Sequence, residues 1–324
     1  MPLDPRVAEI MRTAGRPRYT DYRMVAPADA ARAMRAGTWQ RPPPSEGLSV
    51  EDRALDLIDR ELPVRIYRPR GEGPFPVLIN MHGGGWVLGR PDMDDRRCSR
   101  IALEAQAVVI SLDYRLAPEH PYPAALLDGF DTVRWVQSQG AALNMDASRI
   151  ALSGSSSGGN LAAGLCLLLR DLQVARPACL ILNYPVCDGI GKSASYAEFK
   201  DGPSVTADLM DWFWAQYAPP TTDRGLGYVS PLHARSLAGL PPTLITTAEC
   251  DVLRDEAEAF AHRLETDGVP VILRRYDGMP HGFLTMAVEL PQNVEATDLA
   301  IGLLVKTTNP QASGDAGPSV AGEA

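Results

Sequence analysis

From about Leu48 onward, segments with the pattern of strands alternate with segments that have the periodicity of helices. Residues 48–58 and 61–68 read as two strands, the second with apolar and polar side chains in alternation, and together they predict a hairpin at one edge of a sheet. Short apolar runs follow, and continuous apolar character is typical of strands that are covered on both faces. These runs occupy residues 76–81, 107–114, 149–154, 178–185, 242–248 and 269–276.

Helical patterns fill several of the intervals between these runs. They cover residues 123–139, 160–172 and 254–268, and the last ends at Gly268, a residue that favours the left-handed backbone found just beyond helix ends. Strands alternating with helices are typical of a parallel sheet with helices on both faces. The pattern therefore predicts an α/β fold with a mostly parallel, eight-stranded sheet flanked by helices.

Two regions interrupt the alternation, and both are expected to cover one end of the sheet as a helical cap. They are residues 1–45, which end near a proline-rich linker, and residues 186–235, which contain helical and aromatic segments. The remaining chain divides into a core of two parts, 46–185 and 236–308. Residues 309–324 are rich in small residues without periodicity, and we expect them to be disordered.

The strand at 149–154 leads into Gly154-Ser155-Ser156-Ser157-Gly158 and then into an apolar helix. This is a G-x-S-x-G nucleophile elbow, a turn tight enough to require glycine on both sides of the central serine. The elbow predicts Ser156 as a nucleophile at the positive end of a helix dipole. Ser155 and Ser157 lack glycine two places away on each side, and we interpret their hydroxyls as part of the turn.

A second glycine-rich segment, His82-Gly83-Gly84-Gly85-Trp86, directly follows the strand at 76–81. Glycines let backbone N–H groups face an oxyanion without a covering side chain, so Gly83 and Gly84 are candidate oxyanion donors. The N–H of Ser157 is the third. The alternatives are a flexible turn or a phosphate-binding loop, but the spacings G-x-x-x-x-G-K and G-x-G-x-x-G are absent here.

A serine nucleophile needs a base and an acid to orient that base. Enzymes built on such an elbow place the acid and then the histidine after the serine, which favours His281 over the earlier histidines. His281 follows the last predicted strand, whereas His233 is expected to serve local structure. Asp251 follows the preceding strand and is the predicted acid, with Glu249 as its rival.

Composition narrows the function further. A net charge of −9 is the wrong sign for a surface that binds nucleic acid. Five cysteines without metal-ligand spacing indicate buried thiols in a reducing compartment. The first residues lack a signal sequence and no apolar run is long enough to span a bilayer, so we expect a cytoplasmic protein. We expect neither a metal nor an organic cofactor, and a homodimer through an edge strand at 269–276 is a further expectation.

With these motifs in place, the sequence resembles the hormone-sensitive-lipase-like esterases, or bacterial lipolytic family IV, of the α/β-hydrolase superfamily. The resemblance is carried by HGGGW at 82–86, DYRLAPEHPYPAAL at 113–126, GSSSGG at 154–159, YP at 184–185, SPL at 230–232, LPPTLITTAECDVLRDE at 240–256 and HGF at 281–283. Three residues depart from the family pattern: Ser155, where Asp or Thr is common, Ser157, where Ala is common, and Val252, where Pro is frequent.

The resemblance implies an α/β-hydrolase fold with a helical cap and a serine carboxylester hydrolase that cleaves short- to medium-chain acyl esters. It assigns Ser156, Asp251 and His281 to the triad and Gly83, Gly84 and Ser157 to the oxyanion hole. The partner is then a small-molecule ester. An amide-cleaving hydrolase and a non-catalytic small-molecule receptor are the alternatives. Residues expected to contact substrate are His82, Trp86, Met210, Trp212, Phe213 and Trp214.

Overall fold

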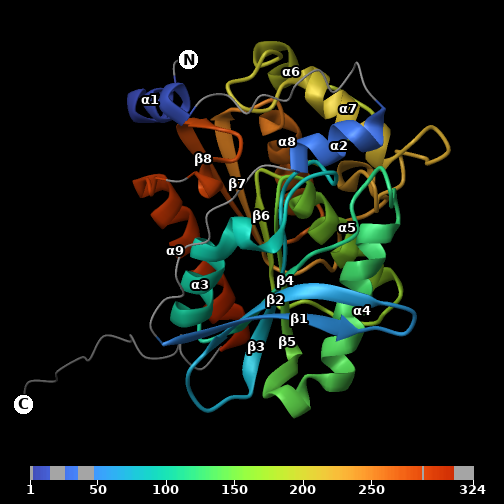
Figure 1. The fold of residues 1–324 in the computed structure, drawn as a ribbon, viewed down its shortest axis with the longest axis vertical. Helices are drawn as coiled ribbons and strands as arrows, with labels where there is room; N and C mark the ends of the chain where they lie inside the picture. The colour runs from blue at the N-terminus through green and yellow to red at the C-terminus, as the bar shows by residue number, and fades with distance from the viewer. Residues whose placement is uncertain (1–2, 15–25, 36–46, 287, 310–324) are drawn as a thin grey trace, which may run out of the picture.

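The computed structural model describes residues 3–14, 26–35, 47–286 and 288–309 and centres on one eight-stranded sheet (Figure 1). Its strand order is β1-β2-β4-β3-β5-β6-β7-β8. The strands are β1 Leu48–Asp56, β2 Glu61–Pro69, β3 Phe75–Met81, β4 Val108–Leu112, β5 Met145–Ser155, β6 Leu180–Asn183, β7 Thr243–Cys250 and β8 Val271–Pro280. The predicted eight-stranded α/β sheet is confirmed.

The strands run in the directions that the sequence pattern predicts. β1 and β2 form the predicted antiparallel hairpin, and β2 also pairs antiparallel with β4. The other neighbouring strands all pair in parallel. Strands β3, β4, β6 and β7 are buried along their whole length, as continuous apolar runs require. The predicted homodimer concerns the outer edge of β8, and it stays a prediction.

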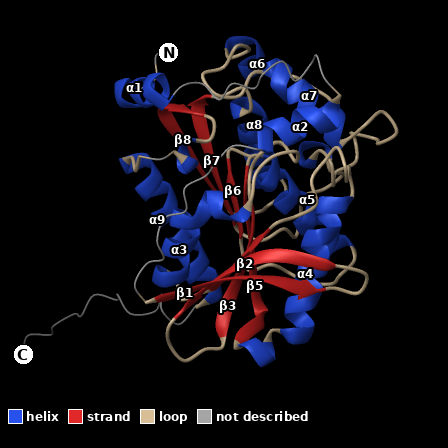
Figure 2. Ribbon diagram, viewed as in Figure 1, coloured by secondary structure: helices blue, strands red, loops and turns tan. Residues whose placement is uncertain are grey.

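Helices cover both faces of this sheet (Figure 2). The α-helices of the described ranges, those of the cap included, are α1 Pro5–Ala14, α2 Pro27–Arg35, α3 Asp95–Glu104, α4 Ala124–Gln139, α5 Ser157–Asp171, α6 Ala194–Glu198, α7 Ala207–Tyr217, α8 Arg254–Thr266 and α9 Pro291–Thr308. Successive strand residues point to opposite layers: Ile79 joins the cluster that includes α4, α5 and α8, whereas Leu78 joins the cluster of α3 and α9. None of the helices in the described ranges combines the length and apolar character needed to cross a bilayer.

Several boundaries differ from the predicted ones in ways that matter for the site. α5 begins at Ser157, three residues earlier than the apolar pattern indicates, because small residues at 157–159 form its first turn. β8 continues to Pro280, so that His281 directly follows the strand. α8 ends at Thr266, and Gly268 takes a φ of 79°, which fits its predicted role beyond the helix.

The region 186–235 folds against the sheet through α6 and α7. The buried side chains of α7 belong to the main hydrophobic cluster, and Trp212 is half-buried against it. Within the first 45 residues, α2 is tied to the core by Arg35, which donates to the carbonyls of Val87 and Ala117 and pairs with Glu119 at 2.9 Å. The predicted disordered tail at 309–324 lies outside the described residues except for Asn309.

Candidate active site

The turn between β5 and α5 holds Ser156 in an unusual backbone conformation, with φ 55° and ψ −120°. The chain can turn this sharply only where neighbouring residues lack side chains. A Cβ atom on Gly154 would lie 2.1 Å from the carbonyl oxygen of Gly158, and one on Gly158 would lie 2.0 Å from that of Met81. Both glycines of the motif are therefore sterically required, and the turn raises Ser156 between strand and helix.

His281 and Asp251 meet Ser156 because β5, β7 and β8 all end at the same edge of the sheet. The Nε2 atom of His281 lies 2.8 Å from the Oγ atom of Ser156, and its Nδ1 atom lies 2.7 Å from the Oδ2 atom of Asp251. Asp251 is 1% exposed, and Ser156 and His281 are each 7% exposed. The three side chains thus form one hydrogen-bonded row that is slightly exposed at Ser156 and His281 and closed to solvent at Asp251.

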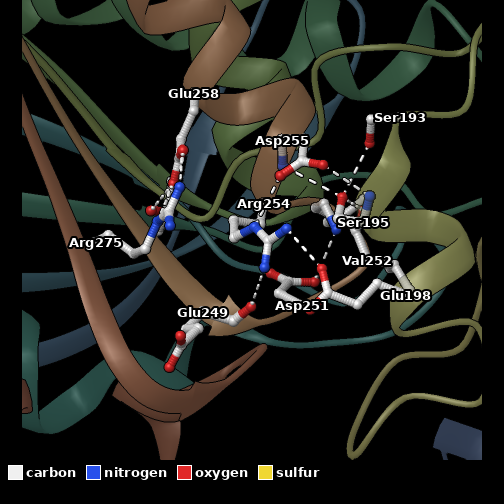
Figure 3. A network of polar contacts seen from close by, with 12 residues as sticks. Ser193, Ser195, Glu198, Glu249, Asp251, Val252, Arg254, Asp255, Glu258 and Arg275 are labelled. Carbon is white, nitrogen blue, oxygen red and sulfur yellow. Dashed lines mark hydrogen bonds and ion pairs between the residues drawn. The ribbon is translucent and has the colours of Figure 1, made fainter. Parts of the chain in front are cut away.

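Glu249, the alternative to Asp251 as the acid, makes its hydrogen bond to a different residue from His281. Its Oε2 atom accepts a hydrogen bond from the backbone N–H of Gly278 at 2.7 Å, and Figure 3 shows its carboxyl group turned away from Asp251. The second carboxylate oxygen of Asp251 accepts from the N–H of Leu253 at 3.0 Å. Among the histidines set aside, His233 contacts Asp188 at 2.9 Å, which fits a local role.

The glycine loop runs beside the serine. A Cβ atom on Gly83 would lie 3.4 Å from that of Ser156, and Gly84 takes a φ of 128°, where a side chain would strike the carbonyl oxygen of Leu88 at 2.2 Å. Within the described ranges, no acceptor takes a hydrogen bond from the backbone N–H groups of Gly83, Gly84 or Ser157. These donors are available to a ligand next to the serine.

Ser156 and His281 open into a cavity of ≈ 160 Å³. Its lining consists of Gly83, Gly84, Gly85, Leu88, Met93, Asp94, Ser155, Ser156, Tyr184, Ser204, Val205, Leu209, Met210, Phe213, His281, Gly282 and Thr285. The cap closes over the glycine loop so tightly that a Cβ on Gly85 would lie 2.3 Å from the ring of Phe213. The walls are mainly apolar on the cap side and polar on the core side.

Comparison with known proteins identifies the family. A family model described as the alpha/beta hydrolase fold matches residues 78–285. The chain is 38% identical over 292 residues to the carboxylesterase NlhH of Mycobacterium tuberculosis, which covers 86% of this chain and 89% of NlhH. The chain belongs to the hormone-sensitive-lipase-like family of α/β hydrolases.

Other relatives of this α/β hydrolase are also named for ester cleavage. The ethyl acetate hydrolase of Pseudomonas putida is 37% identical over 242 residues, which is 73% of this chain and 76% of the relative. The crystal structure of a thermostable esterase from Pseudomonas putida ECU1011 superimposes with a TM-score of 0.85 at 32% identity, covering 95% of this chain and 98% of the esterase. These likenesses support the predicted class of activity, serine carboxylester hydrolysis.

Of the predicted substrate contacts in this hydrolase, Met210 and Phe213 line the cavity, and the other four do not. His82 is fully buried and stacks on Tyr114 with ring centres 4.2 Å apart, and burial lowers the pKa of its imidazole. Trp86 stacks on the ring of Tyr217 at 4.3 Å. Spacing along the chain cannot distinguish a cavity wall from core packing at these positions.

Trp214 is the third aromatic residue that packs away from the cavity, and its ring tilts against Trp86 at 4.6 Å. Trp212 is half-buried and lies outside the lining. His82, Trp86 and Trp214 therefore support the glycine loop and α7 of the hydrolase from behind, which corrects the expectation that they contact substrate.

Tyr184 is a wall residue that sequence reasoning noted only as part of a shared motif. It directly follows β6 with a φ of 37°, and its ring meets that of His281 edge-on at 4.9 Å. Burial raises the pKa of its phenol. Its place at the carboxyl end of a central strand is the signal that could have found it.

The turn that carries Asp251 is fastened to the cap of the hydrolase (Figure 3). Ser195 of α6 donates from its Oγ to the carbonyl of Val252 at 2.6 Å, and its N–H donates to Asp255 at 2.8 Å. Arg254 donates to Glu198 of α6 at 2.9 Å and to the carbonyl of Glu249 at 3.1 Å. Among the described residues, no cluster of His, Cys, Asp and Glu is arranged to hold a metal ion.

Proposed function

We propose that this chain hydrolyses short- to medium-chain carboxylic esters, with Ser156 as nucleophile, His281 as general base and Asp251 as the acid that orients it. The observation that carries the proposal is the unbroken row of contacts, 2.8 Å from Ser156 to His281 and 2.7 Å from His281 to Asp251. It ends in a cavity whose wall offers free backbone N–H groups.

The first half of the reaction forms an acyl-enzyme. Asp251 accepts a hydrogen bond from the Nδ1–H group of His281, which keeps Nε2 unprotonated and able to take the proton of the Ser156 hydroxyl as Oγ attacks the ester carbonyl carbon. The N–H groups of Gly83, Gly84 and Ser157 stabilise the oxyanion. The ester C–O bond then breaks, and the alcohol leaves with the proton held on Nε2.

Water completes the cycle. A water molecule gives a proton to Nε2 of His281 while its oxygen attacks the acyl carbon, and the same N–H groups stabilise the second oxyanion. Collapse of this intermediate releases the carboxylic acid and returns the proton to Ser156. The chain's own residues supply every acid and base that the sequence of steps needs.

The cavity supports short acyl groups as substrates. Its ≈ 160 Å³ is small beside the volumes of about 300–1,000 Å³ usual for ligand pockets. Met210 and Phe213 of α7 form part of the wall that limits length. Residues 1–45 and 186–235 together form the cap in this proposal, and the first of these regions lies partly outside the described residues.

The proposal also includes the cellular compartment in which the protein works. All five cysteines are buried free thiols, which supports a reducing compartment such as the cytoplasm. The substrate is a small ester taken from solution.

The decisive experiment replaces the nucleophile. Ser156→Ala lowers kcat on p-nitrophenyl butyrate by about 10⁴-fold or more, because the acyl-enzyme cannot form. Ser157→Ala is much milder, since the Ser157 hydroxyl has no hydrogen-bond partner among the described residues and the N–H is retained. Turnover retained by the Ser156 variant contradicts the proposal.

A p-nitrophenyl ester series from two to sixteen carbons measures the length preference, and we expect the maximum at the short end. A matched pair of ester and amide donors with the same acyl group separates ester from amide cleavage. Failure of the native protein to react with a fluorophosphonate indicates a receptor instead of an enzyme.

A further inference from the structure

A buried pair of opposite charges lies beside the nucleophile and takes no part in the steps above. Asp94 precedes α3 and Arg97 lies in its first turn, and they are 4% and 6% exposed. Asp94 lines the same cavity as Ser156, which is itself only 7% exposed. Asp94 thus forms part of the core-side wall of the cavity that contains the serine.

Asp94 occupies the N-cap position of α3, where aspartate commonly accepts a hydrogen bond from the helix. Its side chain makes no such bond here. It accepts instead from the amide of Asn80 at 3.1 Å, which uses one of the roughly four acceptor positions of a carboxylate. The side chain therefore does not cap α3, and most of its acceptor positions are not used by hydrogen bonds within the described residues.

Arg97, the positively charged member of the pair, also has few hydrogen-bond partners. One terminal nitrogen of Arg97 donates to Asn80 at 3.0 Å, reaches Ser155 at 3.5 Å and approaches Asp94 only to 3.9 Å. Its Nε and other terminal nitrogen are buried without a partner in the described part of the chain. Buried N–H groups left without an acceptor are costly. Arg97 lies outside the cavity lining, and at 3.9 Å it leaves the carboxylate of Asp94 only weakly paired beside the cavity.

The hydroxyl of Tyr184, which lines the same cavity, is also buried without a hydrogen-bond partner among the described residues. The apolar side chains of the cavity lining are Leu88, Met93, Val205, Leu209, Met210 and Phe213. Within the described lining, Asp94 is the one carboxylate. The cavity therefore combines an apolar side, suited to a carbon chain, with one polar corner.

We propose that Asp94 is a specificity residue that accepts a hydrogen bond from a hydroxyl group of the ester, so that hydroxylated esters are the preferred substrates. This inference rests on the proposed function. A free carboxylate on the substrate would be repelled by Asp94, and an ammonium group would compete with the Arg97 guanidinium already present. A hydroxyl donates to Asp94, accepts from a neighbouring N–H or O–H, and carries no charge to desolvate.

The hydroxyl can belong to the acyl part or to the alcohol part, and two substrate pairs separate these sources. The acyl pair is p-nitrophenyl 3-hydroxybutyrate and p-nitrophenyl butyrate. The alcohol pair is 2-hydroxyethyl butyrate and propyl butyrate, and their hydrolysis is measured by the release of acid. We expect kcat/KM to favour the hydroxylated member by about tenfold in one pair, since a charged acceptor is buried beside the donor.

The test variant is Asp94→Ala combined with Arg97→Met, which removes both charges and leaves neither buried alone. In it the ratio within the preferred pair falls to about one. The ratio is internal to each variant, so a general loss of activity does not affect it. Asp92→Asn is the matched control, because Asp92 is equally buried but pairs with Arg90 outside the cavity lining, and it keeps the wild-type ratio.

If the double variant does not fold, Asp94→Leu is measured in its place with circular dichroism as the check on folding. The inference is overturned if wild type shows no preference in either pair, or if the variant keeps it, while plain esters are still cleaved. If the wild-type protein cleaves none of the esters and does not react with a phosphonate, the proposed function itself is overturned. The two failures are therefore distinguishable.

Discussion

At the scale of single residues, the two carboxylates at the end of β7 do different work. The Oδ2 atom of Asp251 holds Nδ1 of His281, whereas the Oε2 atom of Glu249 holds the backbone of Gly278. We expect Asp251→Asn to lower kcat by about 10³- to 10⁴-fold, because an amide N–H at this position favours the wrong imidazole tautomer.

The matched control is Glu249→Gln. Its amide oxygen still accepts from Gly278, so we expect a loss of stability on the order of 1 kcal/mol and no comparable loss of turnover. Steady-state kinetics and thermal denaturation of both variants decide the matter. The opposite order of kcat effects would make Glu249 the acid.

The order of the motifs along the chain could indicate Ser156, Asp251 and His281 as the candidate triad, because each of them lies at the end of a strand in a short, recognisable motif. It could not find the contact between Asp94 and Arg97, since burial next to the serine depends on how α3 packs on the sheet. The same limit applies to Trp86. An aromatic residue beside a glycine loop has the same local pattern whether it faces a ligand or stacks on Tyr217.

At the scale of elements, the cap helix α6 and the turn after β7 behave as one unit. Ser195→Ala removes the hydroxyl that donates to the Val252 carbonyl and accepts from the Asp255 N–H. We expect kcat on p-nitrophenyl butyrate to fall about tenfold with little change in KM, because the turn no longer holds Asp251 firmly.

Ser193→Ala is the control for this prediction. Within the described part of the chain, the hydrogen bond of the Ser193 hydroxyl is to that of Ser195, at 2.9 Å, and it makes no capping bond to α6. We expect less than about a twofold change in kcat. Equal effects of the two substitutions on kcat, or an effect of Ser195→Ala on KM alone, would show that α6 does not position the acid.

The elements themselves were largely predictable because their apolar runs are continuous and buried. The exact ends were less so. The apolar pattern that indicates 160–172 misses the first turn of α5, where glycine and serine residues give no hydrophobic signal. In the cap, the pattern at 206–217 predicts a helix, but only packing decides that Phe213 faces the cavity and Trp214 the core.

At the scale of the whole molecule, one buried acid links stability to pH. Burial raises the pKa of Glu256 well above its ordinary value of 4.5, although the N–H groups of Cys187 and Asp188 act in the opposite direction. The folded state therefore binds more protons than the unfolded state above pH 4.5, and this contribution to stability declines as pH rises towards the folded-state pKa.

Glu256→Gln removes this titration while an amide oxygen still accepts from Cys187. We expect the wild type to lose free energy of unfolding relative to the variant between pH 5 and pH 8, measured by urea denaturation at each pH. The same substitution at exposed Glu265, on the same helix, is the matched control. A difference between wild type and Glu256→Gln that stays constant with pH would contradict the prediction.

The row from serine to histidine joins residues 125 positions apart in the chain, and its histidine follows the last strand of the sheet. In the proposed mechanism, the nascent polypeptide thus carries its nucleophile during translation long before it has a base. It cannot act on esters of the cell until β8 has been made and has joined β7. Hydrolysis of a fluorogenic ester by chains emerging from the ribosome would therefore mark the moment at which the sheet is complete.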